Sequence, residues 1–114
     1  MHEMSIVSNI LNIALETGEE NNLTVISRIK IKVGKQHHLA PDLMKYAFEF
    51  LKKGTIAASA VLEVEKVPVS LICRNCSSSF IVEDSNYICP SCGSVQWEMV
   101  SGRELTIETI EGER

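Results

Sequence analysis

The chain lacks the long apolar run that a membrane-spanning helix requires. Its 114 residues are 45% hydrophobic and 23% charged, yet no uninterrupted apolar stretch approaches the roughly 20 residues that cross a bilayer. The N-terminus also lacks a basic stretch followed by an apolar one, which marks a secretory signal peptide. We therefore expect a cytoplasmic protein of one compact domain with a small insertion, and no membrane partner.

The chain also lacks an excess of positive charge. Eleven Lys and Arg residues stand against fifteen Asp and Glu residues, which gives a formal net charge of −4. A protein that binds nucleic acid through its phosphates needs the opposite balance. We therefore expect no nucleic-acid partner.

Motifs for catalysis are missing from the sequence as well. It contains no P-loop, no glycine-rich dinucleotide turn, and no Ser or Cys nucleophile paired with a spare His. His2-Glu3 does not begin a zincin motif, because Ile6 stands where the second His of that motif is needed. The sequence therefore predicts a protein that is not an enzyme.

Cysteine is scarce, but its placement is informative. The four cysteines form two Cys-x-x-Cys pairs, Cys73/Cys76 and Cys89/Cys92. A two-residue gap lets one tight turn direct two sulfurs at the same ion, and tetrahedral zinc needs four such ligands. The reduced thiols of a cytoplasmic protein favour metal over disulfides. Four protein thiolates leave no position open for catalysis, so the predicted zinc site is structural.

Two other interpretations of the cysteines stay open. A rubredoxin-like iron site has similar knuckles, and a zinc ribbon can be an interaction module for protein or nucleic acid. Residues 69–102 contain one basic residue, Arg74, against Glu83, Asp84 and Glu98. A zinc tetrathiolate adds two negative charges, so this segment is a poor surface for phosphates.

His2 is a candidate ligand of a second metal site. The Met1 amine, the His2 backbone nitrogen and the His2 imidazole can bind one ion through adjacent five- and six-membered chelate rings. These rings force a planar arrangement, which suits Ni(II) or Cu(II). The fourth position stays open to Glu3, to another protein group or to a partner's ligand, so the ion is transferable. The same pattern also fits an ordinary solvated His2, and His37 and His38 fit surface residues.

Hydrophobic periodicity predicts an α+β fold. We expect helices over residues 4–15, ended by Gly18, and from Pro41 to Gly54, and strands over 23–33, 60–64 and 104–110. The simplest arrangement is a three-stranded sheet covered on one face by two helices, with an inserted zinc-ribbon module that carries the four cysteines. The predicted domains are residues 1–70 with 99–114, which form the nickel-binding α/β domain, and residues 71–98, which form the zinc ribbon.

The same patterns predict which side chains are buried. For the first helix and the first strand they are Val7, Ile10, Leu11, Ala14 and Leu15, and Leu23, Val25, Ile29, Ile31 and Val33. For the second helix they are Leu43, Tyr46, Ala47, Phe50 and Leu51. Within the ribbon we expect short strands at Phe80–Val82 and Tyr87–Ile88.

The chain resembles the HypA/HybF family of hydrogenase maturation nickel chaperones from end to end. The segments that carry the resemblance are Met1-His2-Glu3, Ala47-Phe48-Glu49, Gly54-Thr55-Ile56-Ala57, Cys89-Pro90-Ser91-Cys92-Gly93-Ser94 and Ser101-Gly102-Arg103-Glu104-Leu105. The resemblance implies a nickel metallochaperone that binds Ni(II) as cargo at His2, with Glu3 contributing. It also implies a structural Zn(II) on the four cysteines.

The resemblance further implies partners and points to departures. The implied partners are a HypB-type GTPase and the large-subunit precursor of [NiFe]-hydrogenase, while some family members also serve urease. The chain is expected to be a monomer or a homodimer. It departs from the family at Ser77–Ser79, where a glycine often follows the second cysteine, and in the loop 36–40, which holds two histidines.

Overall fold

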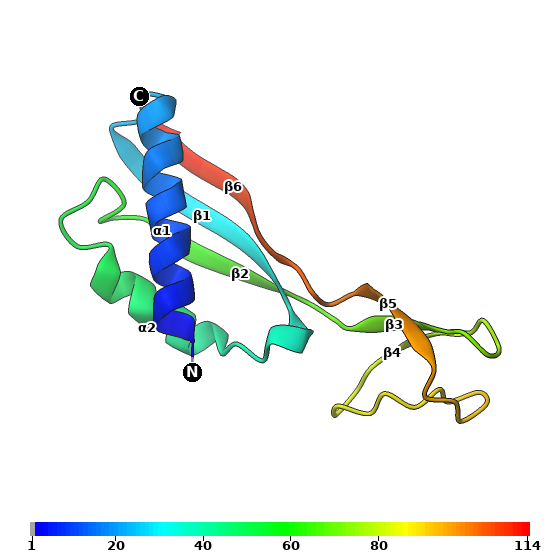
Figure 1. Cartoon of the computed structure of the whole chain (residues 1–114). Coiled ribbons are helices and arrows are strands. Elements are labelled where there is room, and N and C mark those ends of the chain that lie inside the picture. Colours follow the sequence, from blue (N-terminus) through cyan, green and yellow to red (C-terminus); the bar gives the residue numbers. More distant parts are fainter. Residues whose placement is uncertain (1) are drawn as a thin grey trace. The chain divides into compact units, whose positions relative to one another are not determined.

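The computed structural model describes residues 2–114 (Figure 1). Their order along the chain is α1 (Glu3–Glu20), β1 (Val25–Gly34), the 3-10 helix η1 (Lys35–His37), α2 (Pro41–Leu51), β2 (Val61–Val67), β3 (Ser70–Cys73), β4 (Ser79–Ile81), β5 (Trp97–Ser101) and β6 (Leu105–Glu113). Neither α-helix of this part of the chain combines the length and hydrophobicity needed to cross a membrane.

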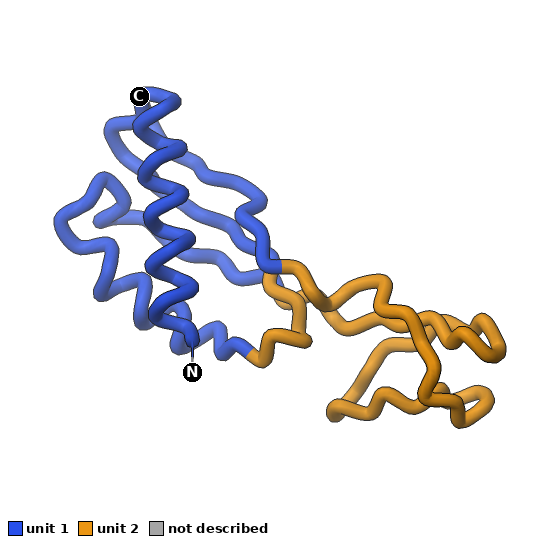
Figure 2. The backbone as a smooth tube through the Cα atoms, in the orientation of Figure 1, with its two compact units in different colours: residues 1–32, 39–65, 105–114 blue, residues 33–38, 66–104 orange. Residues whose placement is uncertain are grey.

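The chain divides into two compact units (Figure 2). The α/β unit contains the residues up to Lys32 together with Leu39–Glu65 and Leu105–Arg114, and the ribbon unit contains Val33–His38 and Lys66–Glu104. Residues 33–38 therefore group with the ribbon, although they lie far from the cysteines in sequence. The domain bounds predicted from the sequence, residues 1–70 with 99–114 and residues 71–98, stay a prediction.

The α/β unit is a three-stranded sheet in the order β2-β1-β6, and α1 and α2 lie over one of its faces (Figure 1). This confirms the predicted α+β architecture. β1 is the central strand, and its Ile29, Ile31 and Val33 side chains are fully buried. The first strand differs from its prediction at its start, because β1 begins at Val25, Leu23 is half-buried, Val25 is exposed and Ile26 is buried. The Ile26 amide donates to the Ile56 carbonyl, 2.9 Å away, in the segment between α2 and β2.

The opposite face of the sheet carries rows of opposite charge. On β1, Arg28 pairs with Glu63 of β2 at 2.9 Å and with Glu111 of β6. Two more cross-strand pairs follow along β1, Lys30 with Glu65 and Lys32 with Glu108. Each exposed pair contributes little alone, but cations flanked by carboxylates on both neighbouring strands favour this strand order over its alternatives.

Helix α1 buries the predicted stripe but runs further than predicted. Val7, Ile10, Leu11 and Ala14 are buried, at the spacing of one helical face, and the fifth predicted residue, Leu15, is half-buried. Gly18 lies within the helix and does not end it. A Cβ at this position would lie 3.2 Å from Ile26 Cδ1, so Gly18 provides a close approach to the sheet.

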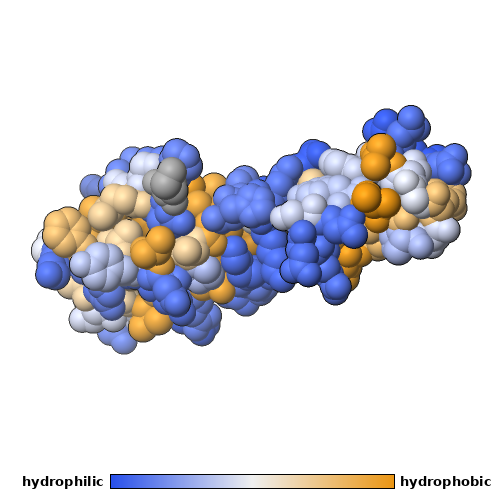
Figure 3. Space-filling model, turned by 90° about the horizontal axis from the view of Figure 1, so that it is seen from below, coloured by the Kyte–Doolittle hydropathy of each residue, from blue (hydrophilic) through white to orange (hydrophobic). Residues whose placement is uncertain are grey.

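The predicted buried face of α2 is correct at Ala47 and wrong at three other positions. It buries Met44, Ala47 and Phe48, and α2 packs against α1. Three members of the predicted stripe are exposed, namely Leu43, Tyr46 and Phe50. The helix has apolar residues on two overlapping faces that share Ala47, and the prediction from the sequence favoured the face that is mostly exposed. Figure 3 shows apolar side chains exposed between polar ones on one face of the molecule.

The ribbon unit is a second antiparallel sheet, in the order β4-β3-β5. Leu71 of β3 is fully buried and lies opposite Phe80 of β4 and Met99 of β5. The prediction of a strand near Phe80 is confirmed, but the strand predicted at Tyr87–Ile88 is wrong. Tyr87 instead packs its ring against Trp97 of β5, with ring centroids 5.4 Å apart.

Within the ribbon unit, residue 34 passes very close to residue 102. A Cβ on Gly34 would lie 1.9 Å from the Gly102 carbonyl oxygen, and Gly34 donates its amide to the Glu104 carbonyl at 2.6 Å. Gly34 has φ −66° and ψ 139°, which any residue adopts. The requirement for glycine at position 34 is therefore steric and not conformational.

We predict that Gly34→Ala and Gly54→Ala both lower the stability of the protein, but for different reasons and by different amounts. Gly34→Ala forces two backbone segments apart and should destabilise the fold by about 3 kcal/mol or more. Gly54 has φ +78° and open space around its Cα, so Gly54→Ala should cost only about 1 kcal/mol of left-handed strain. Urea unfolding of the metal-loaded protein measures both. Equal stability of Gly34→Ala and wild type would contradict the close approach.

Candidate metal centres

The four cysteines converge at one end of the ribbon unit. Their Sγ atoms all lie within 4.8 Å of one another, and two of the pairs, Cys73–Cys92 and Cys76–Cys89, are each 3.6 Å apart. Four thiolates at about 2.3 Å from a tetrahedral ion lie about 3.8 Å from each other. The arrangement therefore fits a tetrahedral metal bound by four sulfurs, as the spacing of the cysteines predicts.

The two knuckles have matching backbone hydrogen bonds. In the first, Ser77 donates its amide to the Cys73 carbonyl at 2.9 Å, and in the second Gly93 donates to the Cys89 carbonyl at 2.8 Å. Ser77 and Gly93 both have positive φ, 63° and 75°. This left-handed conformation suits glycine but strains serine. Ser77 thus occupies the first knuckle's glycine position at a cost in backbone strain.

Local hydrogen bonds and burial shift the pKa values of three of the four thiols, two downward and one upward. The Ser78 hydroxyl, 3.3 Å from Cys76 Sγ, and the Ser78 amide lower the pKa of the Cys76 thiol to about 6. The backbone amide of Cys76 lowers the pKa of the Cys73 thiol. Burial raises the pKa of the Cys89 thiol. Metal ligation requires all four thiolates, so a bound ion must displace a proton that burial favours on Cys89.

The sequence analysis missed two groups next to these sulfurs. The Asn75 side-chain amide donates to Cys92 Sγ across the two knuckles at 3.6 Å, and the Ser78 hydroxyl lies at Cys76. The sequence shows both residues, but it does not indicate which sulfur a polar side chain in or beside a knuckle faces.

His2 is the N-cap of α1, with its side chain exposed. Its carbonyl accepts hydrogen bonds from the Ile6 amide at 3.1 Å and from the Ser5 hydroxyl at 3.3 Å. The first amides of a helix have no partner within the helix, so the His2 backbone nitrogen is not committed to the α1 ladder. The predicted terminal ligand on Met1 lies outside the described residues.

Glu3 is buried at the start of α1, with 6% of its surface exposed. Its Oε2 accepts a hydrogen bond from the Ala40 amide at 3.0 Å. Hydrogen bonds from the terminal amino group and from the Ala40 amide lower the pKa of Glu3 to about 2. The Glu3 side chain is therefore an ionised, structurally engaged carboxylate adjacent in sequence to His2.

The other two histidines belong to the ribbon unit. The His37 Nε2 lies 2.7 Å from the Arg103 carbonyl, which makes Nε2–H the donor. His38 is exposed in a left-handed conformation, with φ 54°. His37 thus fixes residues 35–37 to the chain that leaves β5, which gives it a structural role that the sequence did not indicate.

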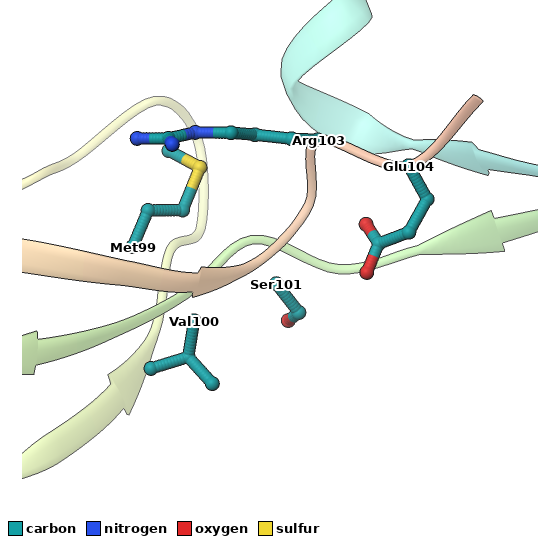
Figure 4. Close-up of a pocket in the computed structure, with 5 residues that line it drawn as sticks. All are labelled: Met99, Val100, Ser101, Arg103 and Glu104. Carbon is teal, nitrogen blue, oxygen red and sulfur yellow. The ribbon is translucent and has the colours of Figure 1, made fainter.

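A hollow of about 340 Å³ lies beside this chain segment (Figure 4). It is lined by Met99, Val100, Ser101, Arg103 and Glu104. Two of its polar side chains make hydrogen bonds to the backbone. Ser101 Oγ donates to the Pro68 carbonyl at 2.9 Å, and Glu104 Oε1 accepts from the Gly102 amide at 2.7 Å. These groups shape the turn after β5.

A four-sulfur centre on a small ribbon, joined to a two-helix α/β unit, defines a small metal-binding protein of two units. Comparison with known proteins identifies the kind. The family described as "HypA: Hydrogenase/urease nickel incorporation, metallochaperone, hypA" matches residues 1–112. The chain belongs to this family of nickel metallochaperones, which are not enzymes, so the resemblance seen in the sequence is confirmed.

Relatives and solved structures agree over nearly the whole chain. The hydrogenase maturation factor HypA of Lawsonia intracellularis is 39% identical, over 99% of this chain and 100% of its own. That of Rhizobium leguminosarum bv. viciae is 32% identical, over 97% and 98%. The solution structure of the Ni metallochaperone HypA from Helicobacter pylori is 25% identical, with a TM-score of 0.68 over 99% of this chain and 98% of that chain.

We predict opposite effects on metal affinity when glycine is introduced in the first knuckle and removed from the equivalent position of the second. Ser77→Gly removes left-handed strain and should tighten zinc binding by about threefold, whereas Gly93→Ala introduces it and should weaken binding by about the same factor. No atom lies within 4 Å of a Cβ at Gly93, so sterics do not confound the comparison. Competition with a chelator measures both affinities. Weaker zinc binding by Ser77→Gly would contradict the strain argument.

Proposed function

We propose that the chain binds Ni(II) at its N-terminus and delivers it for [NiFe]-hydrogenase maturation, while a Zn(II) ion on the four cysteines holds the ribbon together. The observation that carries this proposal is the contrast between two donor sets. The cysteines form a closed sulfur cage, and His2 stands exposed at the start of α1. A closed cage retains its ion, whereas an open site can release one.

The N-cap position of His2 supports the nickel assignment. The His2 backbone nitrogen precedes the hydrogen-bonded part of α1, so a metal can take it without breaking the helix. The His2 imidazole is exposed and free to turn toward the same ion. The Met1 amine, this nitrogen and the imidazole then offer three nitrogen donors in a plane, which suits Ni(II) better than zinc. Glu3 belongs to the same site.

Zinc is the proposed ion of the cysteine cage because its demands match the ribbon. Four thiolates in tetrahedral geometry and no open position are the mark of structural zinc. The reduced cytoplasm, where we propose that the chain works, keeps such thiols available for metal. A rubredoxin-like iron centre would be coloured, so a colourless purified protein distinguishes the two.

The proposed partners are a HypB-type GTPase and the large-subunit precursor of [NiFe]-hydrogenase, with the chain acting as a monomer or a homodimer. Their support is the family to which the chain belongs. The family description names both hydrogenase and urease, and we propose hydrogenase as the client because curated relatives along the whole chain are named hydrogenase maturation factors.

The test is the content of nickel and zinc in untagged protein. Wild type should bind one nickel and one zinc per chain, and His2→Ala should lose nickel but keep zinc. His38→Asn is the matched control, since it removes an exposed imidazole with a residue that tolerates positive φ. Equal nickel binding by wild type and His2→Ala would overturn the N-terminal site and favour an interaction module.

A second prediction isolates the terminal amine. Acetylation of the Met1 amine leaves His2 in place but removes the amine as a nickel donor. Nickel affinity should then fall by at least about tenfold, because one of three nitrogen donors is lost. Isothermal titration with nickel measures the change, and zinc content should not respond. Unchanged affinity would show that the imidazole binds without the amine.

A further inference from the structure

Glu3 is a buried charged residue at the start of α1. Burying a carboxylate is unfavourable unless hydrogen bonds satisfy it. One such bond comes from the Ala40 amide, 3.0 Å from Oε2. Ala40 lies 37 positions away, at the N-cap of α2. The Glu3 carboxylate thus joins the first turn of α1 to the first turn of α2 within the α/β unit.

The Ala40 amide is well placed to hold this carboxylate. Ala40 is extended, with φ −89° and ψ 116°, and Pro41 follows as the first residue of α2. The Ala40 carbonyl accepts the Met44 amide at 3.0 Å, so the peptide is fixed on its helical side. Leu39, the residue before it, is buried. A donor anchored on both sides gives the Glu3 carboxylate a fixed partner.

We infer that Glu3 is a positioning residue of the nickel site, holding His2 in place through its bond to the Ala40 amide, and is not itself a nickel ligand. The inference rests on the proposed function and deepens it by assigning the role of Glu3. His2 has no side-chain capping bond on α1, so the side chain at the N-cap satisfies none of the unpaired amides of the first turn. The Glu3–Ala40 bond restrains this turn one residue away.

The charge of Glu3 contributes in a second way. The N-terminus of a helix carries a partial positive charge, which repels a bound cation. The Glu3 carboxylate lies in the first turn of α1 and offsets this repulsion without contacting the metal. Its charge is therefore useful to Ni(II) even while hydrogen bonds engage the carboxylate.

Three variants separate positioning from ligation. Glu3→Gln keeps an oxygen that accepts the Ala40 amide but loses the carboxylate that a nickel ligand requires. Glu3→Ala loses both. Ala40→Pro removes the donor N–H; the observed φ of −89° is about 25° from that of proline, and ψ 116° is compatible with a following proline. Ala40→Ser keeps the N–H and is the matched control.

If Glu3 is a positioning residue, the nickel affinity of Glu3→Gln should stay within about threefold of the wild-type affinity. The nickel affinities of Glu3→Ala and Ala40→Pro should then be about tenfold or more weaker than that of wild type. If Glu3 ligates, Glu3→Gln should be as weak as Glu3→Ala, and Ala40→Pro should match wild type. That second pattern overturns the inference, as does wild-type affinity in all three variants. Nickel titration followed by the visible absorption of planar Ni(II) measures all of them.

Two further readouts keep the test decisive. Amide exchange at residue 40 of the nickel-free protein should accelerate in Glu3→Ala but not in Glu3→Gln; equal protection in all forms would also overturn the inference. If Ala40→Pro loses its zinc or its thermal transition, the comparison of Glu3→Gln with Glu3→Ala decides alone. Failure of the proposed function is recognised separately, because wild type itself would then bind no nickel or His2→Ala would bind it normally.

Discussion

Four cysteine sulfurs around a single point are the constraint on which the ribbon unit depends. The buried apolar side chains of residues 66–104 are Val69 and Leu71, together with Cys73 and Cys89 themselves. So small a core cannot stabilise a segment of this length, whereas a structural zinc ion contributes on the order of 10–16 kcal/mol in small fingers. The positive φ of Ser77 is tolerable because the metal outweighs its strain.

The α/β unit solves a different problem. It has a core between two helices and a sheet, so buried apolar side chains supply its stability, and the proposed nickel ligand His2 is exposed. His2 lies outside the hydrogen-bonded part of α1, and the Glu3 carboxylate fixes the adjacent turn to Ala40. The proposed nickel donors therefore stand at the start of a helix whose first turn is bonded to the N-cap of α2, an arrangement that suits a metal which is held and then released.

The sequence predicted the parts of this account that depend on spacing. Periodicity indicated both helices and the three strands of the first sheet, and the Cys-x-x-Cys pairs indicated the sulfur cage. The prediction from periodicity failed where one pattern of apolar residues is compatible with two buried helix faces. On α2, Phe50 was predicted to be buried, but Phe48 is buried instead. The sequence could not reveal the Ala40 amide, because every residue except proline has one. Periodicity also predicts Gly18 as a helix stop, although its role is packing against Ile26.

The central claim is that one chain holds two metal sites of different chemistry. X-ray absorption at the nickel and zinc edges of one doubly loaded sample tests it most directly. The account predicts zinc surrounded by four sulfurs at about 2.3 Å, and nickel in a planar shell of nitrogen and oxygen without sulfur. Sulfur in the nickel shell, or nitrogen replacing sulfur around zinc, would contradict the separation of the two sites.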